Sequence, residues 1–112
     1  MASCIFCRII GREAPGDIIY EDERVVAFRD INPHAPTHLL VVPRKHIASL
    51  ADAAPEDEAL LGHLLYVGAE LARKEGLERG YRAVINTNRE AGQVVFHMHM
   101  HVMGGRPLRS MG

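Results

Sequence analysis

An alternating histidine run near the C-terminus constrains this chain more than any other feature. Residues 97–101 read His-Met-His-Met-His, and residues 102–105 continue as Val-Met-Gly-Gly. Side chains on a β-strand point to opposite faces with a period of two. A strand here would therefore place the three imidazoles on one face, and the methionines and Val102 on the other.

Three imidazoles on one face could carry out chemistry or bind a metal ion. Its unperturbed pKa lies near ~6.5, so neighbouring rings can act as nucleophiles, proton donors or metal ligands. A merely solvated polar face is the alternative, but the opposite face is fully apolar. A catalytic metal held by the run itself is another alternative. Alternate residues lie ~6.5 to 7 Å apart on a strand, which suits convergence on one ion poorly, and no clear carboxylate partner is adjacent.

Length and charge set broad limits. The chain of 112 residues suits a single domain spanning 1–112. Its 47% apolar residues build a small core, which a metal or a partner subunit would help to stabilise. The formal net charge of −1 argues against broad binding to nucleic acid or an anionic membrane. No apolar run approaches the ~18 residues of a membrane span, and residues 1–10 lack signal-peptide features, so we expect a cytoplasmic protein.

Local patterns predict an α+β fold, with an antiparallel sheet of about five strands, one long helix and a short N-terminal helix. The short helix is expected over residues 4–10. The long helix is expected over residues 55–75, with Pro55 at its first position and Gly76 as its C-terminal cap. The expected strands are 17–20, 24–28, 37–42, 81–86 and 95–103.

Two glycines inside the long helix need a reason, because each costs up to ~1 kcal/mol relative to alanine. Gly62 and Gly68, with Ala69 and Ala72, would form a low surface that another backbone can approach. Two interpretations stay open. One is ordinary packing of the helix on its own sheet, and the other is a homodimer contact in which two such helices meet.

The chain resembles the histidine triad (HIT) superfamily. The run at 97–103 fits the signature His-x-His-x-His-x-x, and supporting segments lie at 4–10, 26–33, 35–47, 80–86 and 91–93. The short chain and the Gly-Gly pair are most similar to the histidine triad nucleotide-binding branch, whose members are homodimeric purine-nucleotide phosphoramidate hydrolases. The resemblance implies hydrolysis of an AMP-like purine nucleoside phosphoramidate. A dinucleoside polyphosphate hydrolase, or a nucleotide-binding regulatory or scaffold protein with incidental hydrolysis, is the alternative.

The resemblance also implies catalytic roles. His99 would be the nucleophile that attacks the α-phosphate and forms a covalent nucleotidyl-histidine intermediate. Its other ring nitrogen must hold a proton, and a backbone carbonyl near His97 is a candidate acceptor. His101 would contact the same phosphate or protonate the leaving amine. His97 and His38, which matches the fourth histidine of the family's site, complete the catalytic set.

Nucleotide contacts follow from the same resemblance. Asp30 would accept hydrogen bonds from both ribose hydroxyls, Ile31 would pack against the base or sugar, and Asn86 would offer its amide to the sugar-phosphate. Gly92 and Gln93 would direct backbone N–H groups to phosphate oxygens. Taken alone, the residues at 30 and 92 also fit ordinary turns.

Two positions depart from the family pattern. Val94 stands where a serine often contacts the scissile phosphate, so only its backbone N–H can serve there. We expect weaker phosphate contact or a changed leaving-group preference. The segment 106–112 lacks the tryptophan of some relatives, so no specificity is carried over from it.

Cys4 and Cys7 are the only cysteines. A Cys-x-x-Cys pair supplies half of a tetrahedral zinc site, and its surroundings lack the strand-to-helix context of a redox dithiol. Many bacterial HIT proteins are similar in having this pair, and the resemblance implies that His46 and His97 complete a structural zinc site. Two ordinary buried cysteines are the alternative. No organic cofactor is expected.

Overall fold

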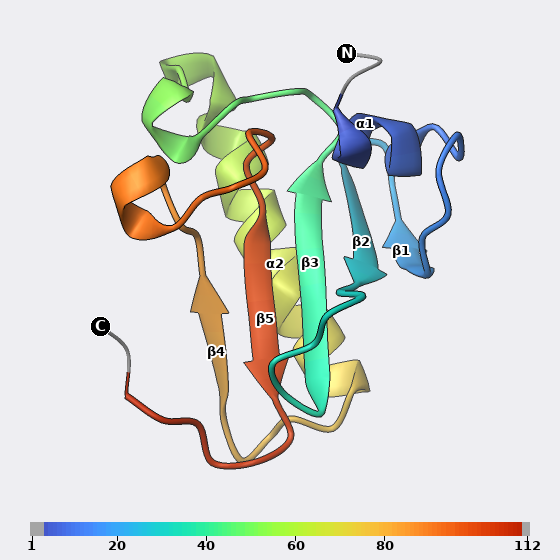
Figure 1. Ribbon diagram of the computed structural model, residues 1–112, viewed down its shortest axis with the longest axis vertical. Coiled ribbons are helices and arrows are strands. Elements are labelled where there is room, and N and C mark those ends of the chain that lie inside the picture. The colour runs from blue at the N-terminus through green and yellow to red at the C-terminus, as the bar shows by residue number, and fades with distance from the viewer. Residues whose placement is uncertain (1–3, 111–112) are drawn as a thin grey trace.

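A five-stranded antiparallel sheet forms the centre of the fold, with a long helix on one face and a short N-terminal helix on the other (Figure 1). The computed structural model describes residues 4–110. The strands are β1 (Ile18–Glu21), β2 (Val25–Arg29), β3 (Thr37–Pro43), β4 (Tyr81–Val84) and β5 (Met100–Gly104), in the spatial order β1-β2-β3-β5-β4. The predicted α+β fold is therefore confirmed.

Both predicted helices are present. Helix α1 (Ile5–Ile10) begins after Cys4, whose sulfur accepts a hydrogen bond from the Cys7 N–H at 3.3 Å. Helix α2 (Glu58–Lys74) begins three residues later than predicted, because residues 55–57 form a 3-10 turn. Gly76, at φ +75°, ends the helical segment as expected. None of the helices within residues 4–110 has the length and apolar character needed to cross a bilayer.

Strand β3 divides its side chains between two cores. Leu39 and Val41 lie in the core formed with α2, whereas Leu40 and Val42 lie in the core that contains Phe6 of α1. The strand alternation places these neighbours on opposite faces. Each helix therefore buries a different face of the same central strand, and the α1 face is also the face of the histidines described below.

Strand β5 is shorter than predicted. It begins at Met100, and the expected strand start at residue 95 is wrong. Pairing with β4 ends at His101, and the N–H of Met98 donates to the carbonyl of Ile47 at 2.7 Å instead of extending a ladder. Residues 95–99 therefore run past the end of β4. For the same reason β4 ends two residues before the predicted 86.

The two glycines of α2 have different surroundings. A Cβ on Gly68 would collide with the end of the Met100 side chain, and Ala72 is buried in the core beside the sheet. Packing of α2 on its own sheet therefore explains these two positions. Gly62 has no described atom within 4 Å of where a Cβ would be, so the predicted homodimer contact stays a prediction there.

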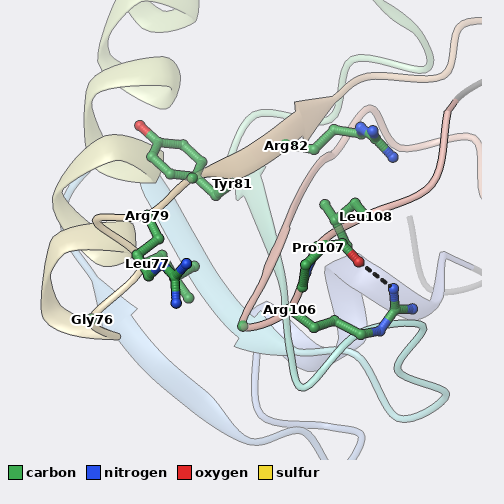
Figure 2. A pocket seen from close by; sticks show the side chains of 10 residues that line it. Gly76, Leu77, Arg79, Tyr81, Arg82, Arg106, Pro107 and Leu108 are labelled. Carbon is green, nitrogen blue, oxygen red and sulfur yellow. Dashed lines mark hydrogen bonds between the residues drawn. The ribbon is translucent and has the colours of Figure 1, made fainter.

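A cavity of about 650 Å³ lies where the C-terminal segment passes the start of β4 (Figure 2). Its lining comes from residues 76–77 and 79–82 and from residues 105–108. Three arginines, Arg79, Arg82 and Arg106, are among the lining residues. The segment that follows the histidine run and the connection between α2 and β4 thus line the same cavity.

Asp22 fixes the turn between β1 and β2 and joins it to α2. Its carboxylate accepts hydrogen bonds from the backbone N–H groups of Arg24 and Val25, at 2.7 and 2.9 Å. It also accepts from the hydroxyl of Tyr20 at 2.7 Å and from Nε2 of His63 at 2.6 Å. Burial alone would raise the pKa of Asp22, but these hydrogen bonds outweigh it and hold the pKa well below its usual range.

Replacing this carboxylate should weaken the fold. We expect Asp22→Asn to lower the free energy of unfolding by about 1 to 3 kcal/mol, because an amide nitrogen replaces one of the two accepting oxygens. Glu23→Gln, at the exposed neighbouring position, should change it by less than about 0.5 kcal/mol. Urea unfolding followed by circular dichroism measures both. Equal effects of the two substitutions would contradict this role of Asp22.

Candidate active site

Three histidines gather on the sheet face opposite α2. His38 lies on β3 and His101 on β5, while His99 immediately precedes β5. Met100 and Val102 lie in the core with α2, so the alternating His101 faces the other way. The ring centroids of His99 and His101 are 5.1 Å apart, as are those of His38 and His101. The three rings therefore form one continuous group.

His99 is held with one defined nitrogen free. Its Nδ1 lies 2.8 Å from the backbone carbonyl of His97, and because a carbonyl only accepts, Nδ1 carries the proton. The Nε2 atom therefore keeps its lone pair. The ring packs edge-to-face on Phe6 with centroids 5.0 Å apart. Burial lowers the pKa of His99, although the hydrogen bond to His97 opposes this, so the ring is neutral near pH 7.

A chain of hydrogen bonds defines the protons of His38 and His101. The backbone N–H of His34 donates to Nδ1 of His38 at 3.0 Å. Neutral His38 therefore carries its proton on Nε2, which lies 2.8 Å from Nδ1 of His101. His101 accepts there and holds its own proton on Nε2. Asp30 Oδ2 lies 3.4 Å from His38 Nε2, close enough to attract the same proton.

Burial keeps these rings uncharged. It is the main cause that lowers the pKa of His101 to about 4, and the neighbouring rings of His99 and His38 lower it further. Burial also lowers the pKa of His38, although the charge of Asp30 opposes it. Near pH 7 the face thus presents a neutral imidazole with a free lone pair beside a neutral N–H donor, and a phosphate can approach these two rings without charge repulsion from them.

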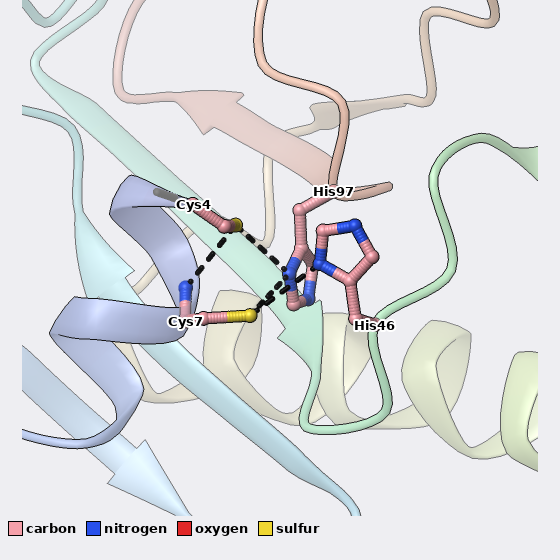
Figure 3. Close-up of side chains that lie close together, drawn as sticks. All are labelled: Cys4, Cys7, His46 and His97. Carbon is pink, nitrogen blue, oxygen red and sulfur yellow. Dashed lines mark hydrogen bonds between the residues drawn. The ribbon is translucent and has the colours of Figure 1, made fainter. Parts of the chain in front are cut away.

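His97, the first histidine of the run, points elsewhere. It is fully buried, and its Nε2 donates to the carbonyl of Pro43 at 2.7 Å. Its Nδ1 lies 3.5 Å from the sulfur atoms of both Cys4 and Cys7 (Figure 3). The side chain of His97 is therefore engaged with the cysteines, and only its backbone carbonyl contacts His99.

Cys4, Cys7, His46 and His97 form a compact donor set (Figure 3). Their ligand atoms all lie within 4.8 Å of one another, and Nδ1 of His46 is 3.4 Å from the sulfur of Cys7. In a tetrahedral zinc site, sulfur and nitrogen ligands are about 3.6 Å apart. The observed S···N distances of 3.4 to 3.5 Å fit that geometry. These four residues can hold a metal ion.

The residues expected to bind the nucleotide differ in their surroundings. One oxygen of Asp30 accepts the N–H of Asn32 at 2.8 Å, which forms the turn, and the other is directed to His38. Ile31 is 85% exposed, so its side chain is free to contact a ligand. Asn86 is partly buried and follows the end of β4.

The side chain of Gln93 holds the loop before the histidine run through three hydrogen bonds. Its buried side chain accepts the N–H of Asn88 at 2.7 Å. It donates to the carbonyls of Ala48 and Val95 at 2.7 and 3.0 Å. Every polar atom of this amide is thus used to hold the loop, a role that the sequence does not indicate.

The backbone N–H groups expected at a phosphate are partly occupied. Those of Gly92 and Gln93 donate to carbonyls of the preceding turn, at 2.9 and 3.2 Å. The N–H of Val94 makes no hydrogen bond within residues 4–110, and this side chain is 84% exposed. Of the three, the N–H of Val94 is the one left available to a phosphate oxygen.

Two further contributors were missed from the sequence. His34 acts through its backbone N–H, which every residue except proline carries, so no sequence signal identifies it. Phe6 contacts the ring of His99 and lies between the two cysteines of the Cys-x-x-Cys pair. An apolar residue between two cysteines at metal-binding spacing is the signal that could have pointed to it.

Known proteins are similar to this chain in sequence and in fold. The family model described as HIT domain matches residues 11–108. A protein of Escherichia coli K12 named purine nucleoside phosphoramidase is 52% identical over 108 residues, which cover 96% of this chain and 91% of that protein. A HIT family hydrolase from Legionella pneumophila superposes with a TM-score of 0.93 at 47% identity, over 96% of each chain. A Zn-bound histidine triad family protein from Mycobacterium smegmatis superposes with a TM-score of 0.81 at 40% identity, over 94% of this chain and 76% of that one.

The burial of His101 should make the protein sensitive to acid. Its pKa falls from ~6.5 in the unfolded chain to about 4 in the folded protein. Between these values the unfolded chain binds more protons, so stability is lost as the pH falls. From pH 7 to pH 4.5 we expect the melting temperature to fall less for His101→Gln than for the wild type. The two proteins differ only in this side chain, so parallel falls in melting temperature would contradict the low pKa of His101.

Proposed function

Because this chain belongs to the HIT family, we propose that it is a purine nucleoside phosphoramidase, which hydrolyses the P–N bond of an AMP-like nucleoside phosphoramidate. The observation that carries the proposal is the state of His99. Its Nδ1–H is held by the His97 carbonyl at 2.8 Å, which leaves the Nε2 lone pair free for phosphorus. The similarity to the E. coli phosphoramidase supports the same reaction.

In the first step, Nε2 of His99 attacks the α-phosphorus as the P–N bond breaks. The electron pair of that bond leaves on the amine nitrogen, which takes the proton held at Nε2 of His101. The imidazole of His99 becomes positively charged when it is bonded to phosphorus. The His97 carbonyl stabilises this charge through the proton that remains on Nδ1.

In the second step, water attacks the phosphorus and the electron pair of the P–N bond to His99 returns to Nε2. The proton lost by the water goes to His101, which restores the resting state. Between the two steps His101 carries the negative charge left by the departed proton, with its ring centroid 5.1 Å from that of the positively charged His99, and this charge makes it a base towards the attacking water. His101 can therefore exchange a proton in both steps.

Nucleotide recognition is proposed for the loops beside the rings. A carboxylate has about four lone-pair positions, so Asp30 can accept ribose hydroxyls while it accepts the N–H of Asn32. The exposed side chain of Ile31 would cover the base or sugar. The N–H of Val94 would contact a phosphate oxygen, and Asn86 would reach the sugar-phosphate.

We also propose that the Cys4–Cys7–His46–His97 set binds a structural zinc ion. Four protein donors leave no position for a reacting water, so a bound zinc supplies cross-linking rather than chemistry. These residues would tie the start of α1 and the loop after β3 to the segment before β5. His97 would then be held at both ring nitrogens, and its carbonyl would orient His99 more rigidly.

A homodimer and a cytoplasmic location complete the proposal. Gly62, Leu65, Tyr66 and Ala69 share one helical face, where Leu65 is 54% and Tyr66 58% exposed. Strand β4 lies at the edge of the sheet and is open to pairing. The thiols of a zinc site persist in a reducing compartment, which favours the cytoplasm.

The nucleophile can be tested directly. We expect His99→Ala to lower kcat for an adenosine phosphoramidate by about 10³-fold or more, with AMP affinity by calorimetry retained. Quenching of the wild type with an activated adenylate in alkaline denaturant, in which a phosphorus–imidazole bond is stable, should give an AMP adduct that maps to His99. His63→Gln, on the α2 side, serves as the control and should keep activity. An adduct on another residue, or activity in His99→Ala, would contradict the proposal.

The metal site gives an independent prediction. Protein purified without chelator should contain about one zinc ion per chain by elemental analysis, and Cys7→Ser should lose it, because thiolate ligands dominate such sites. The melting temperature of Cys7→Ser should fall and become insensitive to chelator. His63→Gln should keep its zinc. Wild-type protein without zinc after supplementation would contradict the assignment.

A further inference from the structure

The glycine pair after the histidine run turns the chain back towards the loop before β3. Gly105 has φ +101°, and a Cβ there would lie 2.9 Å from Cβ of Pro36. Both the backbone conformation and the close approach require glycine. The turn brings Arg106 beside His34, and its Nη2 donates to the His34 carbonyl at 3.0 Å. Its Nη1 donates to the carbonyl of Pro107 at 2.9 Å (Figure 2).

The residue held by Arg106 is the residue that orients His38. The His34 N–H donates to Nδ1 of His38 at 3.0 Å, and Nε2 of His38 lies 2.8 Å from Nδ1 of His101. A guanidinium and a backbone N–H can only donate. The direction of each hydrogen bond from Arg106 to His101 is therefore determined.

We propose that Arg106 is a positioning residue for proton transfer by His101. It holds the backbone of His34, whose N–H occupies Nδ1 of His38 and so keeps the proton on Nε2, where Asp30 also attracts it. Nδ1 of His101 must then accept, and the proton of His101 stays on Nε2, the nitrogen that would face the leaving group. The catalytic consequence of this inference rests on the proposed function. Its statement about which nitrogens of His38 and His101 carry protons does not.

Loss of Arg106 would leave the proton positions on His38 and His101 no longer fixed. Without a donor at its carbonyl, the exposed His34 segment can move. Asp30, 3.4 Å from Nε2 of His38, is then the remaining group that favours a proton there, so in part of the molecules the proton can shift to Nδ1. Nε2 of His38 would then accept, so His101 would have to donate from Nδ1. The nitrogen facing the leaving group would carry no proton, and a poorly departing amine would no longer be protonated.

The side chain of Arg106 is suited to such a role because it supports no core. It is exposed, and both of its hydrogen bonds go to backbone carbonyls. Arg82 lines the same cavity (Figure 2) without a hydrogen bond to His34. Arg82 thus offers a matched control, with the same charge in the same cavity and no connection to His38.

The kinetic test compares Arg106→Met with Arg82→Met on two adenylates. One carries an alkylamine, which needs a proton to leave, and the other carries p-nitrophenolate, which does not. We expect Arg106→Met to lower kcat about tenfold for the amine, the loss that corresponds to one hydrogen bond to a charged group. It should lower kcat less than about twofold for the nitrophenyl ester. Arg82→Met should change neither.

Histidine ¹⁵N shifts provide a readout that does not depend on turnover. Wild type and Arg82→Met should show His38 protonated on Nε2, and Arg106→Met should show a mixture of tautomers. Equal loss on both substrates with unchanged His38 shifts, or no loss at all, would overturn the proposal. If the wild type hydrolyses neither adenylate, the proposed function fails, and the ¹⁵N shifts still decide whether Arg106 orients His38.

Discussion

The hydrogen bond from Nδ1 of His99 to the carbonyl of His97 is the interaction on which the site depends. At 2.8 Å it assigns the proton to one nitrogen and leaves the other free. The shortened strand makes this possible. Because β5 begins at Met100, the carbonyl of His97 is not used in pairing with β4 and can accept from a side chain two residues away. The late start of β5, which the sequence pattern does not predict, is thus what frees this carbonyl for His99.

His97 links the two halves of the site. Its ring faces the cysteines and the Pro43 carbonyl, while its backbone faces His99. The short helix α1 contributes to both halves, since Cys4 and Cys7 approach the ring of His97 and Phe6 packs on the ring of His99. A change in the donor set can therefore reach His99 by two routes, through the backbone of His97 and through Phe6 of α1.

Much of the fold follows from local pattern. Alternation in the histidine run and in β3, the turn residues and the glycine at 76 predict the elements to within a few residues, with larger error at the start of β5. The periodicity of a strand shows which face of the sheet each side chain is on. The end of a strand is set by where its neighbouring strand stops pairing with it, and the neighbouring strand is far away in the sequence. The glycines of α2 show the same limit, because Gly68 packs on Met100 across the core while Gly62 does not.

The amino-acid sequence alone determined the chemical groups of the site, the common face of His99 and His101, and the pairing of two cysteines at metal-binding spacing. Tertiary structure decided which nitrogen of each ring holds a proton and separated His97 from the other rings. The N–H groups of Gly92 and Gln93 donate hydrogen bonds within a turn, which the tertiary structure also decided. The physical reason is that an imidazole's tautomer is set by its partner, and partners such as His34 and Pro43 come from other segments of the chain.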